Sequence, residues 1–252
     1  MPKKNFLDYL YIVSLGAISS YSLPPYNYFI FNFFTFSLFF VFIFNKRKKI
    51  SNHKNFFKYG WLFGFGYFLF SLYWISISLT FEQSFKPLVP VAIILLPALL
   101  AIFYGLLTSF FSYFYSKDVV ISFFIFSILF GIIEFLRGFV FTGFPWNLIA
   151  FSFSESLYFI QILSIIGTYS FNLICISLFT VPALLILKNS KKIIFLCLFF
   201  LLVSVSFLIF GNLKNNEFKY LENVENSYTI RAISSNISLD RFYSKQDELK
   251  II

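Results

Sequence analysis

The sequence predicts an all-α polytopic membrane protein, and three observations support this fold class. Hydrophobic residues make up 59% of the 252 residues and charged residues only 12%, too little polar side chain to cover a soluble globule. Apolar runs of membrane-spanning length recur between residues 6 and 210. Short clusters of Lys and Arg separate these runs, so the formal charge of +9 indicates membrane topology rather than nucleic-acid binding.

About seven segments are candidate transmembrane helices, since roughly 20 helical residues cross about 30 Å of hydrocarbon. They are residues 6–23, 27–44, 56–79, 88–114, 119–136, 157–187 and 193–210. The first follows two lysines and could be a signal peptide. However, no small-residue cleavage site follows it, and Pro24-Pro25 leads directly into the second segment, so we interpret it as a helix. Residues 1–211 are thus expected to form a helical membrane domain, followed by a tail, 212–252.

Basic residues lie in alternate connections between the predicted helices. They precede the first helix and lie between the second and third, fourth and fifth, and sixth and seventh (Lys3, Lys4, Lys46, Arg47, Lys48, Lys49, Lys54, Lys58, Lys117, Lys188, Lys191 and Lys192). By the positive-inside rule, this pattern predicts a cytoplasmic N-terminus and a tail on the opposite face.

Candidate ligands and nucleophiles are sparse within the predicted helices. Cys175 and Cys197 have apolar neighbours in the sequence, which indicates inert core residues rather than nucleophiles. His53 lies in a basic connection with no Cys or carboxylate cluster beside it, so a solvated side chain is favoured over a metal ligand. We therefore predict no metal site and no cofactor.

Two features of the predicted helices concern packing. Gly60 and Gly64 form a small-xxx-small pair that would allow close approach of a neighbouring helix. Pro90 and Pro97 lie in the fourth segment, where we expect a kink.

Polar residues recur at three- and four-residue steps along the sixth segment. Gln161, Ser164, Thr168 and Asn172 would share one face of a continuous helix. That face would form either interhelical hydrogen bonds or a path for a lipid head group.

The run EFLRGFVFTGFPWN (134–147) places a charge pair at the end of the fifth segment. Glu134 and Arg137 are spaced to share a helix face, and pairing lowers the cost of charges in a membrane. Gly143 and Pro145 then break the helix, and Trp146 stands among several Phe residues. Two interpretations stay open: an ion pair that anchors the helix at the interface, or a loop that holds the amphiphilic end of a lipid.

This run, continued by FSFSESLYFIQILSIIGTYSFNLICISLF, resembles a signature of apolipoprotein N-acyltransferases. The shared progression is Glu/Arg-Gly, Thr-Gly-Phe-Pro-Trp, Gln and Gly-x-Tyr. Two upstream runs are also similar to the family, GAISSYSLPPYNYFIFNFFTFSLF and GWLFGFGYFLFSLYWISISLTF. The final run, YTIRAISSNISLDRFYSKQDELKII, resembles the start of the family's extracytoplasmic nitrilase-like α/β domain. There Ser234 and Ser235 replace the usual Gln-Gly, and Phe242-Tyr243 stand where the family has a Trp.

The resemblance implies an enzyme of the bacterial inner membrane with a periplasmic tail. It would transfer an acyl chain from a phospholipid, through a Cys thioester, to the N-terminal diacylglyceryl-cysteine of an apolipoprotein. The family's Glu base, Lys and Cys nucleophile belong to the nitrilase-like domain, so we assign no catalytic residue in this sequence. Glu248 and Lys250 do not lie in the matching motifs.

The tail itself shows the pattern of a strand at 228–233 and of a capped helix at 244–252. One strand and a short helix cannot bury a core. We therefore expect a truncated start of the nitrilase-like domain, poorly ordered in isolation, and no final transmembrane helix of the kind usual in the family.

Three hypotheses follow for the function. The chain is the membrane half of an acyltransferase, inactive alone, with a possible separately encoded C-terminal half; or it is a decayed gene product; or it is a transporter or scaffold without acyltransferase chemistry. If a function survives, the expected lipid-binding residues are those of the opening run, supported by two polar residues of the sixth segment (Glu134, Arg137, Gly143, Pro145, Trp146, Gln161 and Asn172).

Overall fold

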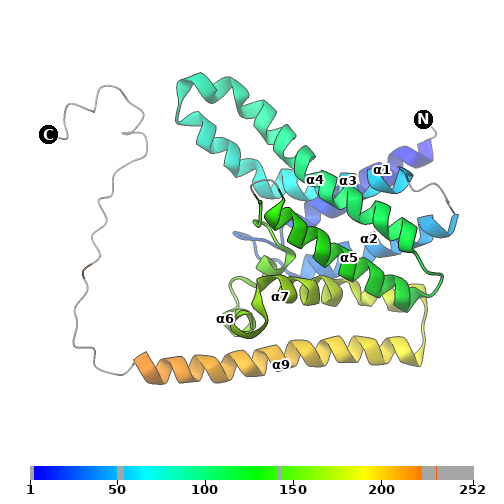
Figure 1. The fold of residues 1–252 in the computed structure, drawn as a ribbon, viewed down its shortest axis with the longest axis vertical. Helices are drawn as coiled ribbons and strands as arrows, with labels where there is room; N and C mark the ends of the chain where they lie inside the picture. The colour runs from blue at the N-terminus through cyan, green and yellow to red at the C-terminus, as the bar shows by residue number, and fades with distance from the viewer. Residues whose placement is uncertain (1–2, 50–53, 141–142, 223–230, 232–252) are drawn as a thin grey trace.

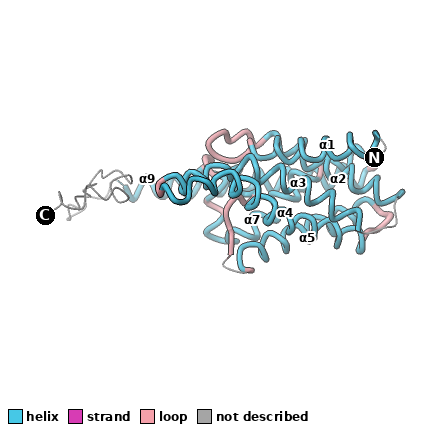
Figure 2. The backbone as a smooth tube through the Cα atoms, turned by 90° about the horizontal axis from the view of Figure 1, so that it is seen from above, coloured by secondary structure: helices cyan, strands magenta, loops and turns pink. Residues whose placement is uncertain are grey.

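A computed structural model describes residues 3–49, 54–140, 143–222 and Arg231. Helices dominate this part of the chain, and it contains no strand (Figures 1 and 2). In chain order they are α1 (Lys3–Ser20), α2 (Ile30–Lys49), α3 (Lys54–Leu72), η1 (Tyr73–Thr80), η2 (Gln83–Leu88), α4 (Val89–Phe114), α5 (Val119–Phe139), η3 (Ile149–Phe153), α6 (Leu157–Ile160), α7 (Leu163–Thr180), α8 (Pro182–Leu187) and α9 (Lys191–Glu222), where η denotes a 3-10 helix.

Six helical stretches of the described chain are long and apolar enough to cross a membrane. They are Ile30–Lys49, Asn55–Thr80, Gln83–Phe114, Val119–Phe139, Leu163–Leu187 and Lys191–Glu217. The first expected span, 6–23, falls on α1, whose apolar part Phe6–Ser20 is shorter. The all-helical membrane architecture is therefore confirmed, and the seven crossings of the membrane stay a prediction.

Helix α3 packs closely between α1 and α4 because glycines remove side chains at the contacts. A Cβ atom at Gly60 would overlap the carbonyl oxygen of Tyr104 on α4, and one at Gly64 would lie 3.0 Å from the Tyr104 side chain. On the α1 side, a Cβ atom at Gly16 would overlap the carbonyl oxygen of Phe63. The predicted close approach at Gly60 and Gly64 is confirmed.

Phenylalanine rings fill the centre of the bundle. Phe39 of α2 stacks on Phe63 of α3 with ring centroids 4.1 Å apart, and Phe36 lies 5.4 Å from Phe130 of α5. All four side chains are buried. Helix α2 thereby joins the α1–α3–α4 layer to α5 and α7.

The two prolines of the fourth segment occupy different places in α4. Pro90 lies in the first turn, where its missing N–H group is not needed. Pro97 lies inside α4, and the kink expected in this segment stays a prediction.

The sixth predicted span is a broken helix rather than a continuous one. Short α6 ends before Gln161, and α7 contains Gly167 in a non-helical conformation (φ 74°, ψ 168°) before Pro182 begins α8. The predicted polar stripe on one face therefore does not form, because the helical periodicity is interrupted twice between Gln161 and Asn172.

The basic ends of several helices meet at one end of the bundle. Lys46 at the end of α2 pairs with Asp8 of α1, and Arg47 Nε donates to the carbonyl oxygen of Ser112 on α4 at 2.7 Å. The connections α4–α5 and α8–α9 lie at this same end, whereas the segment from Gly143 to Ser156 lies at the other (Figure 1).

Helix α9 runs along one side of the bundle (Figure 1). It continues to Glu222, past the boundary expected at residue 211. His53 and the helix expected in the tail lie outside the described residues. The strand expected at 228–233 also lies outside them, apart from Arg231.

Candidate functional site

Helix α5 positions a charge pair inside the protein. Its N-terminus is capped by Asp118, whose carboxylate accepts hydrogen bonds from the backbone N–H groups of Val120 and Ile121. Near the other end, Glu134 and Arg137 are one helical turn apart on one face. Their side chains are 0% and 1% exposed, so the pair points into the protein and not toward the interface.

The ion pair is bidentate. Arg137 Nη2 donates to Glu134 Oε2 at 2.8 Å, and Arg137 Nε donates to Glu134 Oε1 at 3.2 Å. Two parallel charge-assisted bonds fix the plane of the guanidinium group. Burial removes both charges from water, and this cost is offset only when the remaining guanidinium donors also have hydrogen-bond partners. For Arg137, these partners lie at the edge of the guanidinium group that does not contact Glu134.

The other edge of the Arg137 guanidinium group contacts the loop that follows α5. Arg137 Nη1 donates at 2.7 Å to the carbonyl oxygens of both Phe144 and Trp146. In addition, the backbone N–H of Phe144 donates to the carbonyl oxygen of Arg137 at 2.8 Å. These three hydrogen bonds hold the loop against the C-terminal end of α5.

Gly143 allows this loop to return toward the helix. Its φ is +75°, in the left-handed region, and a Cβ atom there would overlap the carbonyl oxygen of Gly138. Gly138 in turn lies against the Tyr169 hydroxyl of α7, where a Cβ atom would also overlap. Gly143 is required by its contact with backbone, whereas the contact at Gly138 is with the end of a side chain.

Aromatic residues of α3 and α4 line the inner side of the ion pair. The Arg137 guanidinium lies 5.2 Å from the centre of the Phe68 ring, a cation–π distance. The Tyr67 hydroxyl donates to the carbonyl oxygen of Asn147 at 2.9 Å. The Tyr104 hydroxyl is buried near Glu134 without a hydrogen-bond partner among the described residues.

The outer side of the loop is exposed and aromatic. Trp146 is 50% exposed and stacks on Trp74 of η1, with ring centroids 5.5 Å apart and planes 10° apart. Pro145 is also exposed. A rigid pair of indole rings at a helix end is typical of the membrane–water boundary.

The two remaining candidate residues lie elsewhere. Gln161 lies between α6 and α7, where its backbone carbonyl accepts from Ser164. Asn172 is buried in α7 and accepts a 2.9 Å hydrogen bond from the backbone N–H of Ala150, which holds η3 in place. Thus the structure brings together Glu134, Arg137 and the loop, and leaves Gln161 apart.

Sequence reasoning missed the partners contributed by α3 and η1. Tyr67, Phe68 and Trp74 lie far from the loop in sequence, and in a Phe-rich chain single aromatic residues carry little signal. Two sequence features indicate Trp74: its rarity, since the chain has three Trp residues, and its place in the run GWLFGFGYFLFSLYWISISLTF, which resembles the family.

The described residues offer no arrangement for nucleophilic or metal chemistry. No group of three or more His, Cys, Asp or Glu side chains among them could hold a metal ion. Cys175 is 1% exposed within the apolar core, and Cys197 packs against this core, with its thiol 3.9 Å from the carbonyl oxygen of Val181.

These features define a polytopic helical membrane protein with a buried ion pair beneath an aromatic loop. The chain belongs to the apolipoprotein N-acyltransferase family, because its residues 15–181 match the apolipoprotein N-acyltransferase N-terminal domain. The resemblance noted in the membrane-spanning part of the sequence is thereby confirmed, and the resemblance of the final run to a nitrilase-like domain stays a prediction.

Three relatives illustrate the similarity. The apolipoprotein N-acyltransferase of Allorhizobium ampelinum is 32% identical over 196 residues, covering 73% of this chain and 36% of the relative. That of Rickettsia typhi is 36% identical over 158 residues, covering 62% and 32%. That of Rhizobium leguminosarum bv. trifolii is 34% identical over 186 residues, covering 71% and 35%. The matched part of the chain thus spans about a third of the length of these relatives.

Proposed function

We propose that this chain supplies the membrane half of an apolipoprotein N-acyltransferase. That enzyme would move an acyl chain from a phospholipid to the N-terminal diacylglyceryl-cysteine of an apolipoprotein. The proposal rests on the two hydrogen bonds that Arg137 donates to the loop, at the carbonyl oxygens of Phe144 and Trp146. A fixed loop with exposed indole rings would receive the head-group end of a lipid.

The role of the ion pair in this proposal is positioning. Removing Arg137 would release two loop carbonyl groups and leave the buried Glu134 carboxylate unpaired. The loop, and with it Trp146, would lose its fixed place beside Trp74. Glu134, Gly143 and Pro145 act through the same loop, while Asn172 supports the adjoining segment and Gln161 has no contact that carries a role.

The proposed orientation places the loop on the periplasmic side of the bacterial inner membrane. Lys46 to Lys49 end α2, and the connections α4–α5 and α8–α9 lie at the same end of the bundle (Figure 1). The positive-inside rule makes this end cytoplasmic, so the opposite end carries Trp146 and Trp74.

We further propose that this chain does not catalyse acyl transfer by itself. The support is chemical: Cys175 lies in the apolar core and Cys197 packs against it, whereas a nucleophilic thiol needs a base or a positive charge to activate it. The nucleophile, base and oxyanion-stabilising group would come from a nitrilase-like domain encoded as a separate chain.

Complementation tests the proposal in cells depleted of apolipoprotein N-acyltransferase. The chain would be expressed alone and together with the C-terminal part of the Rickettsia typhi relative, and lipoprotein N-acylation scored by mass spectrometry. We expect N-acylation only with both parts. Rescue by the chain alone would overturn its inactivity, and no rescue by the pair, with both found in the membrane, would overturn the acyltransferase role.

A matched variant pair sharpens the test. Arg137→Met in the rescuing pair should abolish N-acylation, whereas Leu202→Met on the exposed face of α9 should not. Equal rescue by both variants would show that the loop contacts are irrelevant to the activity.

A further inference from the structure

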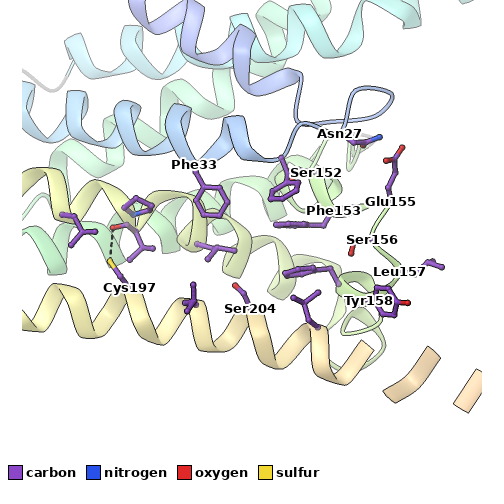
Figure 3. A pocket seen from close by; sticks show the side chains of 18 residues that line it. Asn27, Phe33, Ser152, Phe153, Glu155, Ser156, Leu157, Tyr158, Cys197 and Ser204 are labelled. Carbon is purple, nitrogen blue, oxygen red and sulfur yellow. Dashed lines mark hydrogen bonds between the residues drawn. The ribbon is translucent and has the colours of Figure 1, made fainter. Parts of the chain in front are cut away.

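Two grooves on the sides of the bundle differ in charge. One, of about 790 Å³, lies between α9 and α7–α8, and Glu155 is the only charged residue of the described chain that lines it (Figure 3). The other, of about 480 Å³, lies between α1 and α2 and is called here the α1–α2 groove. Two lysines, Lys46 and Lys49, and one aspartate, Asp8, line the α1–α2 groove, so its lining carries a net charge of +1.

One face of α2 forms most of the α1–α2 groove. Six residues recur at steps of three and one and therefore share this face: Leu38, Val41, Phe42, Asn45, Lys46 and Lys49. The first three are apolar, and the last three are polar or cationic. The rise per residue puts Leu38 and Lys49 about 16 Å apart, roughly half of the hydrocarbon thickness. The groove thus changes from apolar to cationic over the depth of one leaflet.

Helix α1 engages only one of the two lysines. Lys46 pairs with Asp8 and lies 5.1 Å from the centre of the Phe42 ring. An ammonium group has three N–H donors, so this pair leaves two of them for a ligand. Lys49 is exposed, and no hydrogen bond or ion pair engages its ammonium group within the described chain. The groove therefore holds a cation that the described protein does not compensate.

The other two basic residues at the end of α2 lie outside the groove. Arg47 Nε donates to the carbonyl oxygen of Ser112 on α4 at 2.7 Å, and the Arg47 guanidinium lies 5.5 Å from the centre of the Tyr115 ring. Lys48 Nζ lies 4.5 Å from the centre of the Phe44 ring. Neither residue lines the groove. Within the run 46–49, only the first and last residues therefore face it.

We propose that the α1–α2 groove binds one anionic phospholipid, a phosphatidylglycerol, as a structural lipid and not as a reactant. Its phosphate accepts hydrogen bonds from Lys46 and Lys49, and an acyl chain lies along Leu38, Val41 and Phe42. A phosphoglycerol head of ten non-hydrogen atoms fills roughly 300 Å³ at about 30 Å³ each, which fits within the 480 Å³ of the groove. A zwitterionic head group would bring its own ammonium toward two lysines, so the charges favour an anionic lipid.

This site goes beyond the proposed function and lies apart from the loop held by Arg137. The start of α1 and the end of α2 lie at the end of the bundle that carries the α4–α5 connection, opposite the segment from Gly143 to Ser156 (Figure 1). In the proposed orientation, the lipid belongs to the cytoplasmic leaflet. Basic pockets between membrane helices on that side are known to bind anionic head groups. Binding of this lipid therefore requires no acyl transfer.

Native mass spectrometry of the detergent-solubilised chain, with equal amounts of phosphatidylglycerol and phosphatidylcholine, tests the site. We expect one bound lipid, with phosphatidylglycerol favoured. Lys49→Gln should lower the ratio of bound phosphatidylglycerol to phosphatidylcholine by about twofold to fivefold, the range of one exposed charge pair. Lys48→Gln is the matched control, because it removes the same charge from the neighbouring residue outside the groove. An equal fall in both variants, or a fall in neither, overturns the proposal.

Asp8→Asn should change the same ratio in the opposite direction. Without the carboxylate, Lys46 keeps all its donors for the phosphate, and the charge of the lining rises by one. We expect the ratio to rise by about twofold to fivefold. Asp118→Asn removes a carboxylate at the same end of the bundle but outside the groove, and should leave the ratio unchanged. A ratio that stays the same or falls in Asp8→Asn overturns the role of Lys46.

Crosslinking in native membranes identifies the occupant. With both native cysteines replaced by serine, Asn45→Cys would be labelled with benzophenone maleimide and irradiated. Phe195→Cys, at a 72% exposed position of α9 near the same end of the bundle, is the control. A phospholipid adduct richer in phosphatidylglycerol at Asn45→Cys than at Phe195→Cys supports the proposal. Equal lipid composition at the two positions, an adduct with a polypeptide, or no lipid adduct at Asn45→Cys overturns it.

Discussion

Arg137 Nη1 donates a 2.7 Å hydrogen bond to the backbone carbonyl oxygen of Trp146, nine residues along the chain. Because the same guanidinium group holds Glu134, the ion pair and the aromatic loop form one unit. Four predictions follow from this unit and its supports.

Arg137→Met should lower the free energy of unfolding by about 3–5 kcal/mol, because it leaves the Glu134 carboxylate buried without a partner. The double variant Glu134→Leu/Arg137→Met should recover most of this loss, since replacing both members of a buried pair by apolar residues is often neutral. Denaturant unfolding in detergent measures all the variants. A double variant as unstable as Arg137→Met would show that the loop contacts, and not the unpaired charge, dominate.

Gly143→Ala should destabilise the protein by about 1–3 kcal/mol for its positive φ, and further for the overlap with the Gly138 carbonyl oxygen. Thermal unfolding measures the loss. A melting temperature of Gly143→Ala equal to that of the unaltered chain would contradict the close return of the loop.

Tyr67→Phe should cost about 1 kcal/mol of stability, because it removes the hydrogen bond to the Asn147 carbonyl oxygen. Tyr104→Phe should be neutral or stabilising, because the Tyr104 hydroxyl is buried without a hydrogen-bond partner. Both side chains are fully buried, so burial is matched. If Tyr104→Phe proved the more harmful change, its hydroxyl would have to donate to Glu134.

Asp118 makes the stability of α5 depend on pH. Hydrogen bonds from the backbone N–H groups of Ile121 and Val120 hold the pKa of the Asp118 carboxyl below its ordinary value of 3.8. Its contribution is therefore complete above pH 3.8 and is lost as the pH falls through the lowered pKa.

The Asp118 cap is tested with two substitutions. Asp118→Ala should cost about 1 kcal/mol at neutral pH, and Asp118→Asn should keep the cap but remove this part of the acid dependence. Melting temperatures between pH 6 and pH 3 compare each variant with the unaltered chain. Parallel curves for the unaltered chain and Asp118→Asn would refute the pH dependence.

The spans were largely predictable because their signal is local. An apolar run of sufficient length needs no partner to be recognised, so five of the seven expected segments match long apolar helices of similar extent. The first segment matches a shorter apolar helix, Phe6–Ser20, and the sixth is broken. Gly167 takes a positive φ and Pro182 begins a new helix, but an apolar run looks the same whether its helix is continuous or broken.

The site was predicted in part. Glu134 and Arg137 stood out because charges are rare in this chain, and the helical spacing placed them together. Gln161 and Asn172 were grouped by a periodicity that the broken helix removes. Asn172 has a different role, since it accepts from Ala150.

The sequence by itself determined the helical membrane class, the family and the pairing of Glu134 with Arg137. The class follows from the composition, the family from the motifs, and the pairing from the spacing of two residues within one helical turn. Only the tertiary structure decided where the pair points, that Arg137 holds the carbonyl oxygens of Phe144 and Trp146, and that Trp74 covers Trp146. The contacts of Arg137 are with backbone groups, which every residue has, and Trp74 and Trp146 lie far apart in the chain. Contacts of these two kinds produce no recognisable pattern in the sequence.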